Sequence, residues 1–295
     1  MKVSVVIATR DRATFLARAL DSLAAQRGAP AFEVIVADNG STDDTARVIA
    51  ARLASAPFAL RSVVVPQPNR AAARNRAVEV AAGEIVVFVD DDVVLPEAFV
   101  AAHARRYAVP APITVSGPIL NVPSPEDRPQ PTVANASRAF LCTCNASVRR
   151  VDFDAVAGFD ERFSLYGWED TDLGIRLRRL GVRREFAWDA YLYHIKPPAT
   201  ETLDVLLRKT VEKARMAARL VAKDPTTRTR LATGAYAANL ARAAAVAPPW
   251  SLGWYGRLAR SEGTPAPLRA FARAQLLDGT YARELRRALH EGNDA

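Results

Sequence analysis

The sequence has few of the residues that build disulfide-rich or zinc-binding proteins. Among its 295 residues are two cysteines and three histidines. Cys142 and Cys144 stand at i and i+2 of a strand-like pattern, farther apart than a relaxed disulfide usually spans. No second cysteine or histidine pair completes the spacing of a structural zinc site. We therefore expect two reduced thiols.

Long apolar runs and glycine-rich phosphate loops are also lacking. The sequence contains no run of about 18 consecutive apolar residues, so we expect no transmembrane helix. Met1 and Lys2 lead directly into the strand-like VSVVIAT rather than into a hydrophobic leader. From this we expect a cytoplasmic protein. Neither GxGxxG nor GxxxxGK[ST] occurs, which argues against Rossmann dinucleotide binding and against a P-loop.

Composition and charge indicate one large domain with an appendage. Apolar residues make up 49% of the chain and charged residues 24%, which is enough to bury a large core. The net charge of +8 is uneven: residues 1–200 carry 24 Lys/Arg against 23 Asp/Glu, and residues 201–295 carry 16 against 9. With the punctuation of Pro197-Pro198, this shift predicts a main domain over 1–198 and a basic helical extension over 199–295.

Strand-like and helix-like patterns alternate in the first part of the chain. Each of the apolar runs VSVVIA, FEVIVA, SVVV and EIVVFV is followed by a helical pattern. The expected helices cover residues 14–26, 43–53, 70–82 and 96–107. Such alternation predicts an α/β fold, with a Rossmann-like, mainly parallel sheet flanked by helices. Ligands of open parallel sheets bind at the carboxyl ends of the strands.

Acidic residues follow two of the predicted strands. Asp38 follows one, and Asp90, Asp91 and Asp92 follow another. Like charges at one edge repel unless a cation or hydrogen-bond donors lie between them. The carboxylate oxygens of the three consecutive acids suit Mg²⁺ or Mn²⁺, and a nucleoside diphosphate would complete the shell of such an ion. Asp38, on a different strand, suits hydrogen bonds from a nucleobase or ribose. The alternative is helix capping, which we prefer for Asp43 or Ser41, since STDD precedes a helical pattern.

Five motifs resemble family 2 glycosyltransferases of the GT-A fold. In chain order they are VSVVIATRDR, FEVIVADNGSTDDT, AARN, AGEIVVFVDDDV and YGWEDTDLGIRLRRLG. The resemblance covers roughly residues 1–195 and implies a metal-dependent, inverting transfer of a sugar from a nucleotide-sugar donor to a hydroxyl acceptor. It implies a nucleotide-sugar half at about 1–110 and an acceptor half at about 111–198.

The resemblance also implies roles for individual residues of the donor site. DDD matches the DxD motif, in which the third acid, Asp92, binds Mn²⁺ or Mg²⁺ and the first lies near the ribose. Asp38 matches the acid that reads the base. The residues expected at the nucleotide-sugar are Thr9, Arg10, Asp38, Arg74, Asp90 and Asp91.

The motif GWEDTDLGIRLRRLG carries the candidate acceptor chemistry. Its leucines fall on one helical face, which places residues 169–172 in the first turn, where the helix dipole favours acids. Trp168 beside Glu169 and Asp170 adds a stacking surface for a sugar and a base for its hydroxyl. In the family resembled, the acidic pair supplies the base of a single displacement, and we predict Asp170 for that role. Trp168 and Glu169 are predicted acceptor-site residues.

Two further residues come mainly from the resemblance. His194, in YLYHIKPP, has a strand-like context, whereas His103 and His290 fall in helical patterns typical of surface residues. Related GT-A enzymes carry a metal-binding histidine downstream of the acidic pair, which implies His194 as a second metal ligand. The family also has an acceptor-side loop where this chain reads CNASVRR, which implies Asn145.

Beyond residue 198 the sequence predicts a basic amphipathic helix over TLDVLLRKTVEKARMAARLVAK. Such a helix either packs on its own domain or rests on anionic lipid, peripheral on the inner face of the membrane, where a lipid-linked acceptor would be found. Nucleic acid is a poorer partner, because the basic residues lack interleaved aromatics.

Two other classes of function remain open at this point. A nucleotidyltransferase also uses an α/β sheet, acids and Mg²⁺, but needs a phosphate-binding loop after the first strand, where TRDRATF has no glycine. A non-catalytic sugar- or membrane-binding module needs neither DDD nor WED. The presence of both motifs favours an enzyme.

Overall fold

The computed structural model of the chain describes residues 2–137, 139–197 and 201–291. The chain divides into two compact units, an N-terminal unit of residues 1–164 and 169–198 and a C-terminal unit of residues 165–168 and 199–295. Residue 198, where the sequence predicts the domain boundary, lies outside the described residues.

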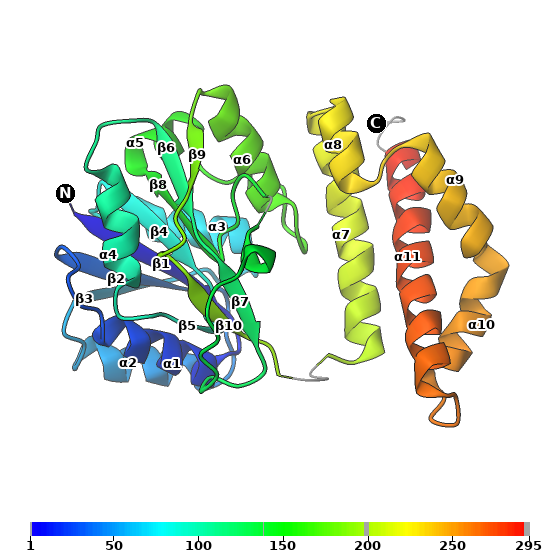
Figure 1. The fold of residues 1–295 in the computed structure, drawn as a ribbon, viewed down its shortest axis with the longest axis horizontal. Helices are drawn as coiled ribbons and strands as arrows, with labels where there is room; N and C mark the ends of the chain where they lie inside the picture. The colour runs from blue at the N-terminus through cyan, green and yellow to red at the C-terminus, as the bar shows by residue number, and fades with distance from the viewer. Residues whose placement is uncertain (1, 138, 198–200, 292–295) are drawn as a thin grey trace. The chain divides into compact units, whose positions relative to one another are not determined.

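A seven-stranded sheet with the order β3-β2-β1-β4-β8-β6-β9 forms the centre of the N-terminal unit (Figure 1). The four strands that come first in the chain are parallel neighbours. They are β1 (Val3–Thr9), β2 (Phe32–Asp38), β3 (Ala59–Val64) and β4 (Ile85–Val89). The other three are β6 (Ile113–Ser116), β8 (Asn145–Arg149) and β9 (Arg183–Phe186).

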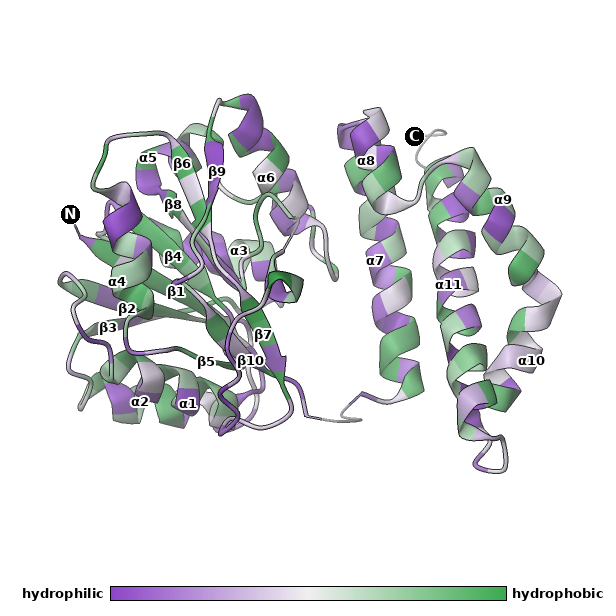
Figure 2. Cartoon of the chain, in the orientation of Figure 1, coloured by the Kyte–Doolittle hydropathy of each residue, from purple (hydrophilic) through white to green (hydrophobic). Residues whose placement is uncertain are grey.

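Helices cover both faces of this sheet. Successive residues of β1 point to opposite faces, so Val5 packs in the apolar cluster that includes α1 and α4, and Val6 in the cluster that includes α3, α5 and α6. The parallel strands in the middle of the sheet are accordingly mostly hydrophobic in Figure 2, whereas β9 is largely hydrophilic. The helices are α1 (Ala13–Ala24), α2 (Thr45–Leu53), α3 (Arg70–Val80), α4 (Phe99–Ala104), α5 (Arg150–Ala155) and α6 (Glu169–Arg179). The predicted α/β fold is confirmed.

A second, smaller sheet brings a distant strand to the end of β4. Its order is β5-β10-β7, from β5 (Val93–Val94), β10 (Leu192–Ile195) and β7 (Ile119–Val122). β10 runs antiparallel to β5 and pairs His194 with Val93. Because β5 follows the three acids directly, this pairing sets His194 beside them. Gly117, before β7, lets its backbone pass close to Ala190, before β10. A Cβ at position 117 would lie 1.8 Å from the Ala190 carbonyl oxygen.

The loop expected around CNASVRR is a strand instead, and that prediction is wrong. Residues Asn145–Arg149 form β8, which is antiparallel to both β4 and β6 in the middle of the sheet. Its polar residues Asn145 and Ser147 are fully buried. The fold tolerates this because the side chains of His103 and Tyr107 form hydrogen bonds with them. The polar residues of this segment are the reason that its sequence did not predict a central strand.

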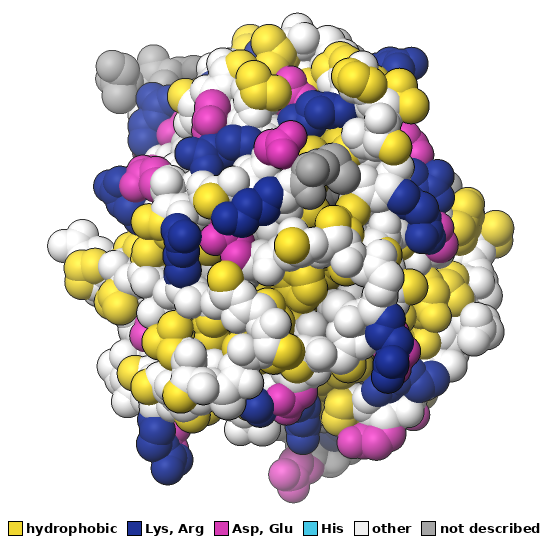
Figure 3. Space-filling view, turned by 90° about the vertical axis from the view of Figure 1, so that its left-hand side faces the viewer, with side chains coloured by type: hydrophobic (Ala, Val, Ile, Leu, Met, Phe, Trp, Pro, Cys, Tyr) yellow, Lys and Arg dark blue, Asp and Glu magenta, His cyan; other side chains and the backbone are white. Residues whose placement is uncertain are grey.

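Acidic and basic side chains are mixed over the surface of the N-terminal unit. In Figure 3, Lys and Arg lie next to Asp and Glu in the upper part and toward the lower edge of the face drawn, and hydrophobic and other uncharged atoms fill the middle. Ion pairs such as Arg27–Glu97 and Arg106–Asp189 account for part of this mixing. The near balance of charge in the first 200 residues is thus also a local balance.

The C-terminal unit contains five helices within the described residues. They are α7 (Leu203–Lys223), α8 (Thr227–Thr233), α9 (Ala237–Val246), α10 (Pro249–Arg260) and α11 (Ala266–Glu291). α7 matches the predicted amphipathic helix and shows hydrophilic and hydrophobic stripes (Figure 2). Its buried stripe, including Ala214, Ala217 and Val221, packs against Leu285 of α11. Small side chains let the helices approach closely.

Candidate active site

The carboxyl ends of β1, β2 and β4 lie side by side at one edge of the large sheet. Thr9, at the end of β1, is the register partner of Asp38 at the end of β2. Thr9 Oγ1 also donates a hydrogen bond of 2.7 Å to Asp91 Oδ2, just beyond β4. Three of the predicted donor-site residues therefore meet at one edge, as the parallel order of the strands requires.

The three consecutive acids have different cationic partners. Asp90 pairs with Arg74, with 3.3 Å between Oδ1 and Nη2. Arg12 bridges the other two, because its Nη1 lies 3.0 Å from Asp91 Oδ1 and 2.6 Å from Asp92 Oδ2. Two guanidinium groups thus offset much of the repulsion among the acids.

Burial affects the pKa values of Asp91 and Asp92 differently. Burial raises the pKa of Asp91 to about 6, because the charge of Arg12 and the hydrogen bond from Thr9 offset the loss of water only in part. Burial also acts to raise the pKa of Asp92, but the hydrogen bond and charge of His194, together with Arg12, outweigh it and lower that pKa to about 2. Asp92 is therefore the permanently ionised member of the pair.

His194 reaches the acids from β10. Its Nε2 lies 3.0 Å from Asp92 Oδ1, and its Nδ1 lies 3.0 Å from Asn121 Oδ1 on β7. A metal ion between the two groups would take the place of the Nε2 proton in the contact with Asp92, while Nδ1 continues to donate to Asn121. Adjacent ligand atoms of an octahedral ion stand about 3.0 Å apart when each bond is about 2.1 Å long. The Asp92 and His194 donor atoms therefore fit one small divalent cation.

Arg12 rather than Arg10 contacts the acids. Arg10 is half exposed, and its Nε lies 3.6 Å from Asp11 Oδ2. Asp11 has a φ of +51° and holds the loop by accepting hydrogen bonds from Thr42. A left-handed residue turns the chain between the two arginines. The spacing in TRDR does not reveal that turn, so the sequence analysis missed Arg12.

The acidic pair of α6 is connected to the donor edge through Arg74. α6 begins at Glu169, so the prediction that residues 169–172 form its first turn is confirmed. The buried guanidinium of Arg74 lies 3.3 Å from Glu169 Oε1 and 3.3 Å from Asp90 Oδ1. Glu169 Oε2 is buried and has no hydrogen-bond partner in the described part of the chain.

Asp170 is held by Thr143, a residue that the sequence analysis missed. The Thr143 amide donates to Asp170 Oδ2 at 2.9 Å, and Thr143 Oγ1 lies 3.0 Å from each carboxylate oxygen. Burial and the charge of Glu169 raise the pKa of Asp170 to about 6, against the opposing effects of Arg74 and the Thr143 amide. Such a carboxylate is mostly ionised at neutral pH and is a stronger base than an exposed aspartate.

Comparison with known proteins decides the family. The model of glycosyl transferase family 2 matches residues 4–152 of the 295. The chain belongs to glycosyltransferase family 2. A second family model, described as the N-terminal domain of galactosyltransferase, matches residues 130–197 of this family 2 member, the stretch that contains α6 and His194.

Relatives and solved structures agree with this membership. Validoxylamine A glucosyltransferase of Streptomyces hygroscopicus subsp. limoneus is 31% identical over 223 residues, which cover 61% of this chain and 48% of that protein. The chain thus spans about half the length of this relative. YfnE of Bacillus subtilis, an uncharacterized glycosyltransferase, is 26% identical over 68% of this chain and 66% of its own length.

The solved structures establish the fold type. Mannosyltransferase PcManGT from Pyrobaculum calidifontis, in complex with GDP-Man and Mn²⁺, has a TM-score of 0.64 and 22% identity over 96% of this chain and 86% of that one. Residues 1–349 of Staphylococcus aureus TarS with UDP-GlcNAc have a TM-score of 0.57 and 19% identity over 99% and 92%. At such identities the likeness shows the fold, which is of the GT-A type.

Two predicted acceptor residues of this family 2 member have other contacts in the structure. Trp168 belongs to the C-terminal unit, where its Nε1 donates a 2.9 Å hydrogen bond to the Lys213 carbonyl oxygen of α7. Its φ of +76° is a strained conformation for a non-glycine residue. Asn145 is fully buried, and its amide donates to the carbonyl oxygens of Pro118 and Ala190. In this arrangement Asn145 presents no exposed atom to an acceptor.

The prediction that His103 is a surface residue is wrong. His103 is fully buried, with Nδ1 2.9 Å from Ser147 Oγ and Nε2 3.0 Å from Asn145 Oδ1. Burial lowers its pKa to about 4, because a charged imidazole would lose its hydration there. The helical pattern was correct, but the side chain of His103 packs on Asn145 and Ser147 of β8 rather than meeting water.

Proposed function

We propose that the protein is an inverting, metal-dependent glycosyltransferase that moves a sugar from a nucleoside-diphosphate sugar to a hydroxyl acceptor. The observation that carries this proposal is the approach of His194 to Asp92 at the edge where the parallel strands end. Membership of family 2 supports it, as do the GDP-Man with Mn²⁺ and the UDP-GlcNAc bound by proteins of the same fold.

Asp92 and His194 would hold the proposed cation, Mn²⁺ or Mg²⁺, next to the diphosphate of the donor. When bound, the ion neutralises the charge that develops on the departing diphosphate. Arg12 keeps the two neighbouring carboxylates in place, and Asn121 fixes the ring of His194 through Nδ1.

The donor nucleoside is proposed to lie along the ends of β1, β2 and β4. Asp38 accepts hydrogen bonds from the base, and Asp90 and Asp91 lie on the ribose side. Thr9 and the exposed Arg10 stand at the same edge. Arg74 is engaged by carboxylates on both sides, so its proposed role is to position Asp90 and Glu169. The nucleotide sugars in the two solved structures of this fold differ in base, so guanine and uracil nucleotides are both candidates for the donor.

The chemical step is proposed to depend on Asp170. Its carboxylate removes the proton of the acceptor hydroxyl while the oxygen attacks the anomeric carbon and the nucleoside diphosphate leaves, which inverts the configuration. Thr143 orients the carboxylate for this transfer. Glu169, with its unpartnered Oε2, and Trp168 are proposed to contact the acceptor.

Isothermal titration with GDP and with UDP, each with Mn²⁺, tests the proposal. We expect one nucleotide to bind the native protein in a metal-dependent manner, and Asp92→Asn to weaken that binding by at least about tenfold, because the amide lacks the charge that opposes the cation. Asp44→Asn, a change of a largely exposed acid on the loop before α2, is the matched control. Equal affinity in Asp92→Asn and the control contradicts the metal assignment.

Contact between the C-terminal helices and anionic lipid is also proposed. No helix of the described residues is long and apolar enough to span a bilayer. On α10, however, Trp250 is 83% exposed and Trp254 48% exposed, one turn apart, and Arg257 is exposed on the same face. Tryptophan beside basic side chains is typical of helices that lie in a membrane interface.

A further inference from the structure

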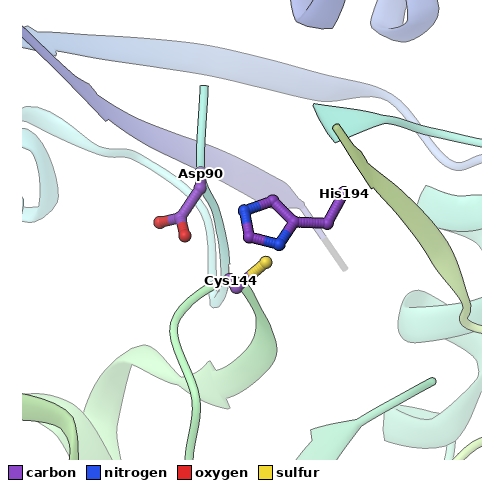
Figure 4. Close-up of side chains that lie close together, drawn as sticks. All are labelled: Asp90, Cys144 and His194. Carbon is purple, nitrogen blue, oxygen red and sulfur yellow. The ribbon is translucent and has the colours of Figure 1, made fainter. Parts of the chain in front are cut away.

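A cysteine lies among the acids of the donor edge. Sγ of Cys144, an imidazole nitrogen of His194 and a carboxylate oxygen of Asp90 all lie within 4.8 Å of one another. They come from the turn before β8, from β10 and from the end of β4. In Figure 4 the sulfur of Cys144 lies next to the ring of His194, and the carboxylate of Asp90 lies to the left of the same ring.

This set of donor atoms differs from the one that the proposed Mn²⁺ or Mg²⁺ site uses. Hard divalent ions bind carboxylate, phosphate and water oxygens, whereas thiolate, imidazole and carboxylate together suit Zn²⁺. Sulfur adds nothing to a site for Mg²⁺. The cysteine therefore gives the donor edge a preference that the acids alone do not have.

The present contacts of Cys144 are compatible with metal binding. Its side chain hydrogen-bonds the Asp90 carboxylate, and a metal ion would replace the thiol proton in that contact. Donor atoms around tetrahedral zinc stand about 3.3–3.8 Å apart, so the set closes on an ion after shifts of about 1 Å. The fourth position is left for water or a phosphate oxygen.

We infer that Asp90, Cys144 and His194 form a zinc site that shares His194 with the proposed Mn²⁺ or Mg²⁺ site. The two ions would share one imidazole ring and lie beside adjacent acids, so the charge of a bound Zn²⁺ opposes binding of the hard ion. Zn²⁺ also binds N and S donors more tightly than Mn²⁺ does. Zinc is therefore an antagonist of donor binding, a consequence that rests on the proposed function, whereas the zinc site itself does not.

Cobalt spectroscopy on the full-length protein tests the site without donor or acceptor. We expect Co²⁺ to give a sulfur-to-metal charge-transfer band in the near ultraviolet, which added Zn²⁺ abolishes. Cys144→Ser should lose the band, and Cys142→Ser, the matched control two residues away, should keep it. A band that is absent from the native protein, or that persists in Cys144→Ser, overturns the inference.

Zinc-edge X-ray absorption on the native protein needs no variant and decides the matter should Cys144→Ser fail to fold. We expect one sulfur at about 2.3 Å from the zinc, with nitrogen and oxygen completing the shell. A shell of nitrogen and oxygen alone overturns the site.

Competition then separates the zinc site from its consequence. We measure how much Zn²⁺ reduces nucleotide affinity in the presence of Mn²⁺. This reduction should be at least tenfold smaller in Cys144→Ser than in the native protein. Equal sensitivity of the two proteins shows that the ions do not compete through Cys144, and it overturns the shared site. Failure of nucleotide binding itself, with the cobalt band intact, contradicts the proposed function and leaves the zinc site standing.

Discussion

In the N-terminal unit a buried ion pair joins residues far apart in the sequence, whereas in the C-terminal unit an exposed pair joins neighbouring turns of one helix. Arg74 and Glu169 are 95 positions apart and both are less than a tenth exposed. Arg287 and Glu291, by contrast, are four positions apart on α11 and more than half exposed. Buried charges cost several kcal/mol each in lost hydration, but exposed pairs change stability by only about 0–1 kcal/mol.

The difference indicates where the chain retains charge for chemistry rather than for solubility. A fold tolerates desolvated acids such as Asp91 and Glu169 when cations offset them or when a ligand binds them. The C-terminal unit also has buried acids, but Glu284 pairs with Arg215 between two packed helices and Asp224 accepts a hydrogen bond from Thr229. The stability of the C-terminal unit comes mainly from apolar contacts between α7, α10 and α11.

Replacement of Asp170 should give the largest effect. Asp170→Asn retains the shape of the side chain but cannot take a proton, so we expect transfer to fall by about 10²–10⁴-fold. Donor affinity should stay near normal, because Asp92 and Asp38 belong to other elements. The rate of transfer, nucleotide affinity and thermal midpoint are measured on one preparation.

An acid of the C-terminal unit provides the control. Asp278→Asn removes the exposed partner of Arg242 and should leave the rate unchanged. Near-normal turnover in Asp170→Asn would falsify its role as the base and move that role to Glu169 or Asp172. Loss of donor affinity as well would mean that Asp170 belongs to the donor site.

The pH dependence of transfer should show a smaller effect. Asp170 acts when ionised, so with a pKa of about 6 the value of kcat/KM should fall about tenfold per pH unit below that pH. Thr143→Val removes a hydrogen bond to the ionised carboxylate and therefore raises its pKa. We expect the acidic limb of the profile to move up by about one unit.

Thr143→Ser keeps the hydroxyl and should keep the native profile. If the limb stays in place in Thr143→Val as well, another group controls it, and Asp91, whose pKa is raised to a similar value, is the next candidate.

The smallest effect concerns the C-terminal unit and anionic vesicles. We expect the native protein to bind them less as salt rises, since charges are screened over about 10 Å at 0.1 M. Trp250→Ala and Arg219→Glu should each weaken binding several-fold. Arg219 is a better site for charge reversal than Arg215, because Arg215 pairs with Glu284.

The exposed tryptophan of the N-terminal unit, Trp188, gives the matched control for this experiment. Trp188→Ala should bind vesicles as the native protein does. Binding that responds to neither salt nor the two changes in the C-terminal unit would assign the exposed aromatic face of α10 to some other contact.

The sequence by itself determined the elements and the edge of the sheet at which the acids meet. Apolar runs of period two and helical stripes are local signals, and parallel strands bring their carboxyl ends to the same edge. From these signals follow the α/β class, the convergence of Asp38 and Asp91 and the start of α6 at Glu169. These three features can be predicted because each is set by residues of one helix turn or of neighbouring strands.

Only the tertiary structure decided which side chains touch at that edge. Arg12 takes the place expected for Arg10 because Asp11 adopts a positive φ, and Thr143 meets Asp170 across 27 positions. Cys144 approaches His194 because β10 crosses to pair with β5. Contacts of this kind depend on how whole elements pack, and packing over long separations leaves no periodic pattern in the sequence for a reader to find.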